Sequence, residues 1–312
     1  MLLLPGQNLA GNRMNGLISK IQRYSTKDGP GLRSTVFSVG CPLRCKWCAN
    51  PELIQASEKI FYHAERCVGC GACVRSSGGT IYLTDNGCAI DRVACANLGQ
   101  CAAACFYDAY EHVGVTISAE DLADKLLRDK AFYDQSEGGV TYSGGEAAAQ
   151  ADFFLEITEI LKCESIHVTL DTSGYVPWEK LEPLIKAVDL ILYDIKVMDN
   201  AIHKRYTGVD NHLILENARR IADMRKEMIV RLIIIPGIND DEKEIGGRLD
   251  FVQKLGNVRR VDILKYHRLG AGKYKRLGLA EPMENTPECS GALAEIIAQK
   301  AADMGFEAAI GS

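Results

Sequence analysis

Short apolar runs rich in β-branched residues alternate with longer amphipathic stretches from about Ile18 to the end of the chain. Strands and helices that alternate at this spacing indicate βαβ units and a parallel sheet. The predicted strands are Ser34–Val39, Gly139–Ser143, His167–Asp171, Leu190–Ile195, Ile229–Ile235 and Val261–Lys265. The predicted helices between them are Asp152–Lys162, Trp178–Val188, Asn211–Arg225 and Asp241–Leu255. Thr286 and Pro287 resemble an N-cap and a first-turn proline, so we expect them to open the last helix.

Polar residues follow several of the predicted strands, at the turn that leads to the next helix. They are the Ser143–Glu146 run, the Asp171–Gly174 run, Asp194 with Lys196, and His267. In parallel α/β barrels the C-terminal strand ends form the active face. We therefore expect the active site at this edge of the sheet.

One segment, from about Phe61 to Glu111, breaks the alternation. It contains seven cysteines, many glycines and alanines, and no long helical pattern. This composition indicates a small inserted domain built around metal rather than around an apolar core. The predicted organisation is one α/β domain made of residues 14–60 and 112–312, with residues 61–111 inserted. Residues 1–13 do not join the pattern, and we expect a flexible N-terminal extension there.

Charge and cysteine content narrow the class of function. The chain has 312 residues, a formal net charge of −5 and twelve cysteines. A net negative charge gives no sign of the basic surface that binds nucleic acid. No apolar run approaches the roughly 18–20 residues of a membrane span. The first residues lack the basic leader of an export signal. Clustered C-x2-C spacings in such a chain indicate cytoplasmic metal sites rather than secreted disulfides.

Three cysteines, Cys41, Cys45 and Cys48, form a C-x3-C-x2-C run directly after the first predicted strand. A [4Fe–4S] cluster has four irons and usually four cysteine ligands. A loop with three thiolates leaves one iron with an open coordination position, as catalytic metal sites generally have. The spacing therefore predicts a cluster that performs chemistry on a bound ligand.

The cysteines of the insertion match part of a two-cluster ferredoxin template, in which each C-x2-C-x2-C-x3-C run lends its fourth cysteine to the other cluster. A first cluster keeps all four ligands, Cys67, Cys70, Cys73 and Cys105. A second cluster keeps only Cys95 and Cys101, with Cys88 as a candidate third ligand. The alternative for the first site is zinc. The alternative for the second is that the site has been lost and its thiols are buried or reactive cysteines.

Taken together, the motifs resemble those of glycyl-radical-enzyme activating enzymes, a subgroup of the radical S-adenosylmethionine (SAM) superfamily. The match runs from about Met14 to Gly311. The runs that carry it are Asp28–Gly31, Cys41–Glu52, Ser143–Glu146, Asp194–Lys196, Tyr206–Val209 and Lys265–Gly270. The resemblance implies a partial (β/α)6 TIM-like barrel, the radical SAM core, with an inserted small ferredoxin-like iron–sulfur domain. It also implies one auxiliary cluster and allows a second.

The family's activity follows as an expectation. A reduced [4Fe–4S] cluster cleaves SAM, and the 5′-deoxyadenosyl radical removes a hydrogen atom from a backbone glycine of a partner glycyl radical enzyme. The resemblance implies an electron donor such as flavodoxin or ferredoxin, and we expect a monomer. In the family a segment like Asp28, Gly29, Pro30 and Gly31 meets the partner's glycyl loop. A plain turn is the alternative for that segment.

The resemblance also assigns residues to SAM. It matches Trp47 to an aromatic beside the adenine, with a core aromatic as the alternative. Lys196 and Arg231 suit a carboxylate, or else are salt-bridge partners at strand ends. The full predicted set is Trp47, Cys48, Ala49, Ser143, Gly144, Gly145, Glu146, Asp171, Thr172, Asp194, Ile195, Lys196, Arg231 and His267. In relatives, positions like Asp171, Thr172 and Asp194 also hold a monovalent cation.

Two other functions compete with this interpretation. An electron-transfer ferredoxin would explain the insertion but not about 200 residues of βα units. A radical SAM enzyme that acts on a small molecule or RNA would keep the cofactor chemistry without a protein partner. The Cys41–Glu52 and Lys265–Gly270 runs look closest to activators of arylacetate decarboxylases, which makes such an enzyme the favoured partner.

Overall fold

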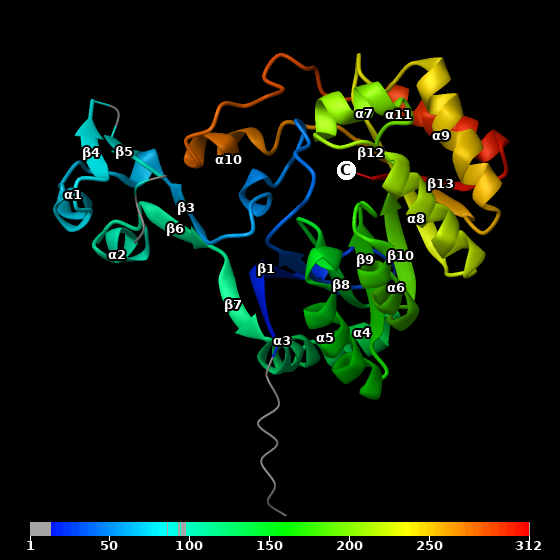
Figure 1. Cartoon of the computed structure of the whole chain (residues 1–312), viewed down its shortest axis with the longest axis horizontal. Helices are drawn as coiled ribbons and strands as arrows, with labels where there is room; N and C mark the ends of the chain where they lie inside the picture. Colours follow the sequence, from blue (N-terminus) through cyan, green and yellow to red (C-terminus); the bar gives the residue numbers. More distant parts are fainter. Residues whose placement is uncertain (1–13, 86, 93, 95–97, 312) are drawn as a thin grey trace, which may run out of the picture.

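The computed structural model describes residues 14–311 except 86, 93 and 95–97, and its centre is a nine-stranded sheet (Figure 1). Seven parallel strands lie side by side in the order β2 (Arg33–Ser38), β8 (Gly139–Gly144), β9 (His167–Thr172), β10 (Leu190–Asp194), β11 (Met228–Ile234), β12 (Arg260–Lys265) and β13 (Glu307–Gly311). β1 (Asn15–Ser25) pairs antiparallel with β2, and β7 (Val115–Ser118) pairs with β1. The six predicted strands and the α/β class are confirmed. β13 and β7 form the two ends of the strand order, so the barrel is open.

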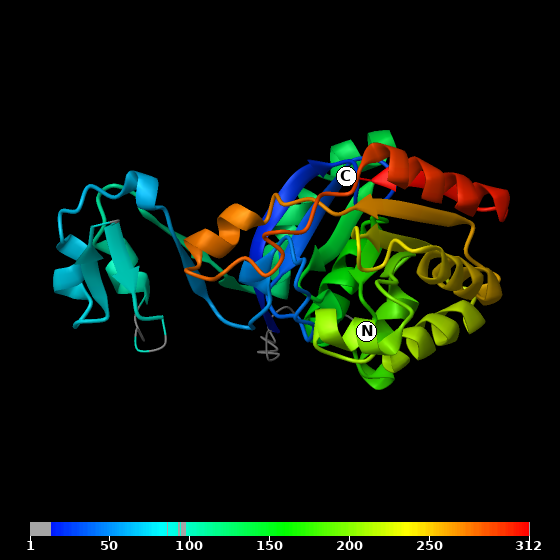
Figure 2. The same ribbon diagram turned by 90° about the horizontal axis from the view of Figure 1, so that it is seen from above.

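Helices follow most of the parallel strands and lie on the outer face of the curved sheet (Figures 1 and 2). They are α3 (Ala119–Leu127), α4 (Lys130–Ser136), α5 (Ala151–Cys163), α6 (Trp178–Ala187), α7 (Asn200–Thr207), α8 (His212–Asp223), α9 (Glu242–Leu255) and α11 (Gly291–Asp303). α10 (Ala271–Arg276) lies apart from these helices, between the barrel and the inserted segment (Figures 1 and 2). Short 3₁₀ turns occur at η1 (Pro51–Leu53), η2 (Ala64–Arg66) and η3 (Ala147–Gln150). The four predicted helices are confirmed. None of the helices in the described ranges has the length and apolar character needed to cross a bilayer.

The predicted start of the last helix is wrong. α11 begins at Gly291, and the Ser290 hydroxyl caps it by accepting a hydrogen bond from the Leu293 amide at 3.1 Å. The Cys289 amide instead donates to the Tyr266 carbonyl at 2.9 Å, which holds the chain along the segment after β12. Thr286 and Pro287 precede that contact, so the helix cannot start at them.

Strand alternation decides which side chains face the inside of the barrel. In β11, Met228, Val230, Leu232 and Ile234 are buried in the core between the sheet and the helices. The residues between them, including Arg231, point to the opposite face, as the period of two requires. The core thus forms on the helical side and leaves the concave face for polar groups.

The inserted segment lies to one side of the barrel (Figures 1 and 2). β3 (Lys59–Tyr62) pairs with β6 (Tyr110–Val113), and β4 (Ile81–Thr84) forms a hairpin with β5 (Gly87–Ile90). α1 (Ala72–Ser76) and α2 (Leu98–Ala103) are short, as the sequence predicted. Arg92 joins the insertion to α10, because its guanidinium donates to the Ile60 carbonyl at 2.6 Å and to the Arg276 carbonyl at 2.9 Å.

Candidate functional site

The three-cysteine loop follows β2 at the C-terminal edge of the sheet, where the polar strand ends predicted it. Its backbone is held from two sides. The Cys41 amide donates to the Ile54 carbonyl at 2.9 Å. The Arg44 amide donates to the Thr207 carbonyl at 2.7 Å, and the Lys46 amide donates to the Tyr206 carbonyl at 2.9 Å. The loop is therefore fixed between its own continuation and the end of α7.

A third contact comes from α10 and the segment before it. A Cβ added to Gly270 would lie 3.0 Å from the Ala49 Cα, so the Lys265–Gly270 run packs against the cysteine loop. The Lys273 ammonium donates to Asn50 Oδ1 and Glu52 Oε1, both at 2.6 Å. Lys273 was not among the predicted site residues. The sign of this contact in the sequence was the Ala49–Glu52 run, which carried the family resemblance. No residue was predicted to contact that run.

The thiols of this loop fit a [4Fe–4S] cluster. Burial raises the pKa of Cys41 and of Cys45 to about 12, and it also raises the pKa of Cys48. The Lys196 ammonium acts in the opposite direction on all three. Thiols in such a site stay neutral until a metal binds and releases their protons. Three desolvated thiols on one loop beside a cation are a suitable donor set for an anionic iron–sulfur cluster.

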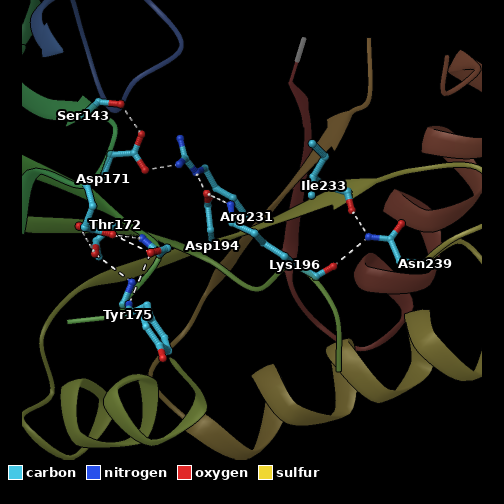
Figure 3. Close-up of polar contacts among 12 residues, drawn as sticks. Ser143, Asp171, Thr172, Tyr175, Asp194, Lys196, Arg231, Ile233 and Asn239 are labelled. Carbon is cyan, nitrogen blue, oxygen red and sulfur yellow. Dashed lines mark hydrogen bonds and ion pairs between the residues drawn. The ribbon is translucent and has the colours of Figure 1, made fainter. Parts of the chain in front are cut away.

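Four neighbouring parallel strands, β8 to β11, supply a network of charges next to this loop, with Arg231 in the middle of β11 (Figure 3). The Arg231 guanidinium donates to Asp171 Oδ1 and, through Nε, to Asp194 Oδ1 at 2.8 Å. Lys196 Nζ donates to Asp194 Oδ2 at 2.8 Å. The Ser143 hydroxyl donates to Asp171 Oδ2 at 2.6 Å. The structure thus brings together five of the predicted SAM residues and pairs Lys196 and Arg231 with carboxylates.

Burial and pairing decide the charges in the network. Burial opposes ionisation of Asp194, yet Arg231 and Lys196 hold its pKa below the ordinary value. The same partners keep Lys196 and Arg231 charged against their own burial, because Asp194 raises the pKa of Lys196 and Asp171 raises that of Arg231. Burial raises the pKa of Asp171 to about 6, although Arg231 acts against the rise. The network is close to neutral overall, with Lys196 as its charge nearest the cysteines.

Glu146 and Thr172 have a positioning role in this structure. Glu146 is 1% exposed, and its carboxylate accepts hydrogen bonds from the Thr172 hydroxyl at 2.7 Å and from the Ser173 amide and hydroxyl at 2.9 and 2.6 Å. These bonds join the end of β8 to the end of β9. The polar atoms of these two side chains have partners within the protein, and their predicted contacts with SAM stay predictions. Ser173 was not predicted.

The glycines of the same run have a similar explanation. A Cβ on Gly144 would lie 2.4 Å from the Ser38 amide nitrogen, and one on Gly145 would lie 2.4 Å from the Gly40 carbonyl. Only glycine lets the end of β8 pack so closely on the start of the cysteine loop. This close packing within the chain accounts for both residues, and their predicted contact with the methionyl amino group stays a prediction.

Trp47, Ile195 and His267 have neighbours in the protein itself. Trp47 is 7% exposed and stacks on Tyr206, with ring centroids 6.0 Å apart, inside the main core. Ile195 is buried, and its amide donates to the Arg231 carbonyl at 3.1 Å. His267 follows β12, and its Nδ1 accepts from the Leu269 amide at 3.3 Å. Their contacts with SAM remain predictions.

The concave side of the sheet encloses a cavity of about 1190 Å³. It is lined by the turn at Thr26–Pro30, by residues of β10 to β13 that include Arg231, and by the segments before β11 and β12, residues 225–227 and 255–257. The turn precedes β2 and the cysteine loop follows it, so six residues of strand, roughly 20 Å, separate the two. The cavity therefore lies toward the N-terminal ends of the strands, and its wall includes both the predicted partner-binding turn and Arg231 of the charge network.

The turn itself is rigid. Asp28 Oδ2 accepts hydrogen bonds from the Ser25 hydroxyl at 2.5 Å and the Thr35 hydroxyl at 2.7 Å. Arg33, which is fully buried, donates to the Pro30 carbonyl at 3.0 Å and to the Thr141 hydroxyl at 2.7 Å. Arg33 was not predicted as a site residue, because a single arginine at the start of an apolar strand gives no local sign of burial.

The four predicted ligands of the first auxiliary cluster come together in the insertion. Cys67, Cys70, Cys73 and Cys105 line one small cavity. Cys88 lines it too, with its sulfur 3.9 Å from that of Cys67 and 3.7 Å from that of Cys73. The structure thus places Cys88 beside the predicted ligands of the first site, and its assignment to a second cluster stays a prediction. Cys95 and the side chain of Cys101 lie outside the described residues.

These five thiols are spread along the walls of their cavity. Among the residues that the structure describes, no three His, Cys, Asp or Glu side chains are grouped closely enough to hold a single ion. A [4Fe–4S] cluster places each of its thiolate ligands on a different iron. The spread of sulfurs around one cavity is compatible with that arrangement.

Comparisons with known proteins agree with this geometry. The family described as the Radical SAM superfamily matches residues 35–247. The trans-4-hydroxy-L-proline dehydratase activating enzyme of Clostridioides difficile is 39% identical over 268 residues, which are 85% of this chain and 88% of that protein. The (2S)-3-sulfopropanediol dehydratase activating enzyme of Klebsiella oxytoca is 37% identical over 85% of this chain and 88% of its own.

Two further comparisons concern a decarboxylase activator and a solved fold. The indoleacetate decarboxylase activating enzyme of Tractidigestivibacter scatoligenes is 35% identical and covers 91% of this chain and 95% of its own. A radical SAM methyltransferase from Sphaerobacter thermophilus has a similar fold, with a TM-score of 0.54 and 12% identity. The alignment covers 94% of this chain and 76% of that one. At this identity the likeness concerns the fold alone.

Proposed function

Because this chain belongs to the glycyl-radical-enzyme activating enzymes of the radical SAM superfamily, we propose that it cleaves SAM reductively and transfers the radical to a partner protein. The hydrogen atom is removed from a backbone glycine of a glycyl radical enzyme. The observation that carries this proposal is the cavity whose wall holds both Asp28, Gly29 and Pro30 of the turn and Arg231 of the charge network.

The cysteine loop holds the reactive metal site in this proposal. Cys41, Cys45 and Cys48 bind three irons of a [4Fe–4S] cluster and leave the fourth position open. When bound, the cluster supplies the electron that cleaves SAM. Lys196 lies close enough to the three thiols to offset the negative charge of their thiolates. Asn239 holds Lys196 in place by donating to its carbonyl at 2.8 Å (Figure 3).

The cavity suits an extended peptide as substrate. Its volume of about 1190 Å³ is at or above the upper end of small-molecule pockets, which are roughly 300–1,000 Å³. The rigid turn at Asp28–Gly31 lies at one end, and Arg231 lies on the wall toward the active site. A glycyl loop that enters along this cavity needs to span the roughly 20 Å length of β2. About six extended residues cover that distance.

The insertion binds auxiliary iron–sulfur clusters in the same proposal. We assign a ferredoxin-like cluster to Cys67, Cys70, Cys73 and Cys105, with domain boundaries at residues 14–60, 61–111 and 112–312. A second cluster at Cys95 and Cys101 stays a prediction. So do the monovalent cation, the flavodoxin or ferredoxin that donates electrons, the monomeric state and the cytoplasmic location.

An arylacetate decarboxylase remains the partner that we favour. The relatives described above are named for an indoleacetate decarboxylase and for two dehydratases, at 35% to 39% identity. Sequence identities this similar do not favour one class of partner enzyme over another. The support is the motif likeness in the Cys41–Glu52 and Lys265–Gly270 runs, which the structure places against each other through Gly270 and Ala49.

The test is an anaerobic incubation of the reduced protein with SAM and either an arylacetate decarboxylase or a dehydratase. We expect a glycyl-radical signal by electron paramagnetic resonance on one of them, matched by 5′-deoxyadenosine formation. Cleavage of SAM without a radical on any partner would favour a small-molecule or RNA substrate. Absence of 5′-deoxyadenosine would favour an electron-transfer ferredoxin.

A further inference from the structure

Five thiols line the metal cavity of the insertion, although a [4Fe–4S] cluster uses four. The additional one is Cys88 on β5. It is 9% exposed, and its sulfur lies within 4 Å of two predicted ligands, at 3.9 Å from Cys67 and 3.7 Å from Cys73. A thiol at this distance can reach the metal that its neighbours bind by a change of side-chain rotamer.

The position of Cys88 is fixed by its hairpin. The Cys88 amide donates to the Tyr62 hydroxyl at 2.7 Å, which ties β5 to β3. This approach requires the glycine before it, since a Cβ on Gly87 would lie 2.3 Å from the Tyr62 hydroxyl. Gly87 also has φ +108°, which other residues rarely adopt. Cys88 is thus held at the cavity by three specific features of the local sequence.

The lining of the cavity contains a second sign of a bound sulfur-ligated group. The Tyr110 hydroxyl is buried and has no hydrogen-bond partner of ordinary geometry in the described residues. The sulfurs of Cys73 and Cys88 are the groups that face it. Buried hydroxyls are rarely left without a partner. Thiolates of an iron–sulfur cluster are hydrogen-bond acceptors, and hydrogen bonds to their sulfurs are common at such sites.

We infer that Cys88 is a reserve ligand of the first auxiliary metal site, able to replace Cys67 or Cys73 when either is lost. This inference rests on the auxiliary cluster of the proposed function. On replacement the Cys88 thiol loses its proton and forms one sulfur–iron bond in place of the bond that was lost, so the ligand count and the charge of the site are unchanged. Cys70 is exposed and has no comparable sulfur contact with Cys88 among the described residues, so its loss is not rescued.

The test uses the full chain with Cys41→Ala, Cys45→Ala and Cys48→Ala together, so that the remaining iron belongs to the insertion. In this parent we compare Cys67→Ala, Cys88→Ala, Cys67→Ala with Cys88→Ala, and Cys70→Ala. Iron and sulfide per chain are measured after anaerobic reconstitution, with electron paramagnetic resonance of the reduced cluster. We expect Cys88→Ala and Cys67→Ala to keep most of the iron. The double variant and Cys70→Ala should lose about four irons, one cluster's worth.

Each outcome decides the inference. Equal loss of iron in Cys67→Ala and in the double variant would overturn the reserve role, and so would loss in Cys88→Ala alone. A parent without iron would overturn the auxiliary cluster and the inference together. Cys73→Ala, alone and with Cys88→Ala, repeats the comparison at the second neighbour. Introducing each change into the chain with an intact cysteine loop checks folding, because the loop cluster must still assemble there.

Discussion

Lys273 on α10 forms an ion pair with Glu52, which lies four residues after the last cysteine of the loop, with 2.6 Å between Nζ and Oε1. Glu52 is 4% exposed, and its second oxygen has no partner in the described part of the chain. The same α10 carries the Arg276 carbonyl that accepts from Arg92 of the insertion at 2.9 Å. One short helix therefore contacts both the reactive loop and the inserted segment.

Loss of this ion pair should loosen the cysteine loop. We predict that Lys273→Ala lowers the free energy of unfolding by about 1–3 kcal/mol, because a buried carboxylate is left without its partner. The measurement is thermal unfolding of the reconstituted protein under anaerobic conditions. Lys275→Ala is the matched control, since Lys275 is an exposed lysine on the same helix. Equal shifts in the two variants would mean that the pair does not stabilise the loop.

The radical chemistry should depend on each cysteine of the loop. We predict that Cys41→Ala, Cys45→Ala and Cys48→Ala each abolish 5′-deoxyadenosine formation while the iron of the insertion is retained. Removal of one ligand from a three-cysteine site leaves too few anchors for a stable cluster. Cys163→Ala is the control, because this cysteine is exposed at the end of α5. Normal SAM cleavage by any of the three loop variants would contradict the assignment.

The Asp28–Gly31 turn should matter for the partner more than for SAM. We predict that Asp28→Ala slows glycyl-radical formation on the order of 100-fold, because small misplacements of a substrate have effects of that size. SAM cleavage without the partner should be nearly unchanged, since the cysteines lie at the other end of β2. Asp28→Asn keeps an acceptor for the Ser25 and Thr35 hydroxyls and should be milder. Equal losses in both assays would place Asp28 in the fold or at the cofactor.

Acid should destabilise the contact between Arg33 and His167. Arg33 Nη2 lies 3.2 Å from His167 Nδ1, and a guanidinium can only donate, so Nδ1 accepts and carries no proton. Burial, then the charge of Arg33, lowers the pKa of His167 below 6.5, while Asp189 acts weakly against this shift. The unfolded chain takes up a proton near pH 6.5 and the folded chain resists it. Stability is therefore complete above pH 6.5 and falls as the pH drops below it.

The measurement for this prediction is the unfolding midpoint between pH 7.5 and about 5.5, the range that brackets the titration of an ordinary histidine. His167→Asn should give a flatter dependence on pH, because the titrating ring is absent. The decisive comparison is how steeply the unfolding midpoint falls with pH below pH 6.5 in the original protein and in His167→Asn. The same slope in both proteins would show that other groups cause the loss of stability.

Local patterns in the sequence were sufficient for much of this protein. Strand and helix periodicity placed β2, β8, β9, β10, β11 and β12 within one or two residues. The C-x3-C-x2-C spacing located the reactive loop, because all its ligands lie within eight residues. The C-terminal ends of neighbouring parallel strands meet at one edge, so the proximity of Asp171 and Asp194 also followed from the order of elements. Arg231, in the middle of β11, joins them because it pairs in register with Asp194.

Contacts between distant residues were decided only by the tertiary structure. Arg33 meets a histidine 134 residues later, and Lys273 meets a glutamate 221 residues earlier. The Glu146 carboxylate joins the ends of β8 and β9, and the Cys88 sulfur lies beside those of Cys67 and Cys73. The edge strands β7 and β13 were also missed, and so was β1, which lies between β2 and β7. Hydrophobic periodicity and motif spacing report on neighbours along the chain, whereas buried ion pairs and shared thiol cavities depend on how separate elements pack.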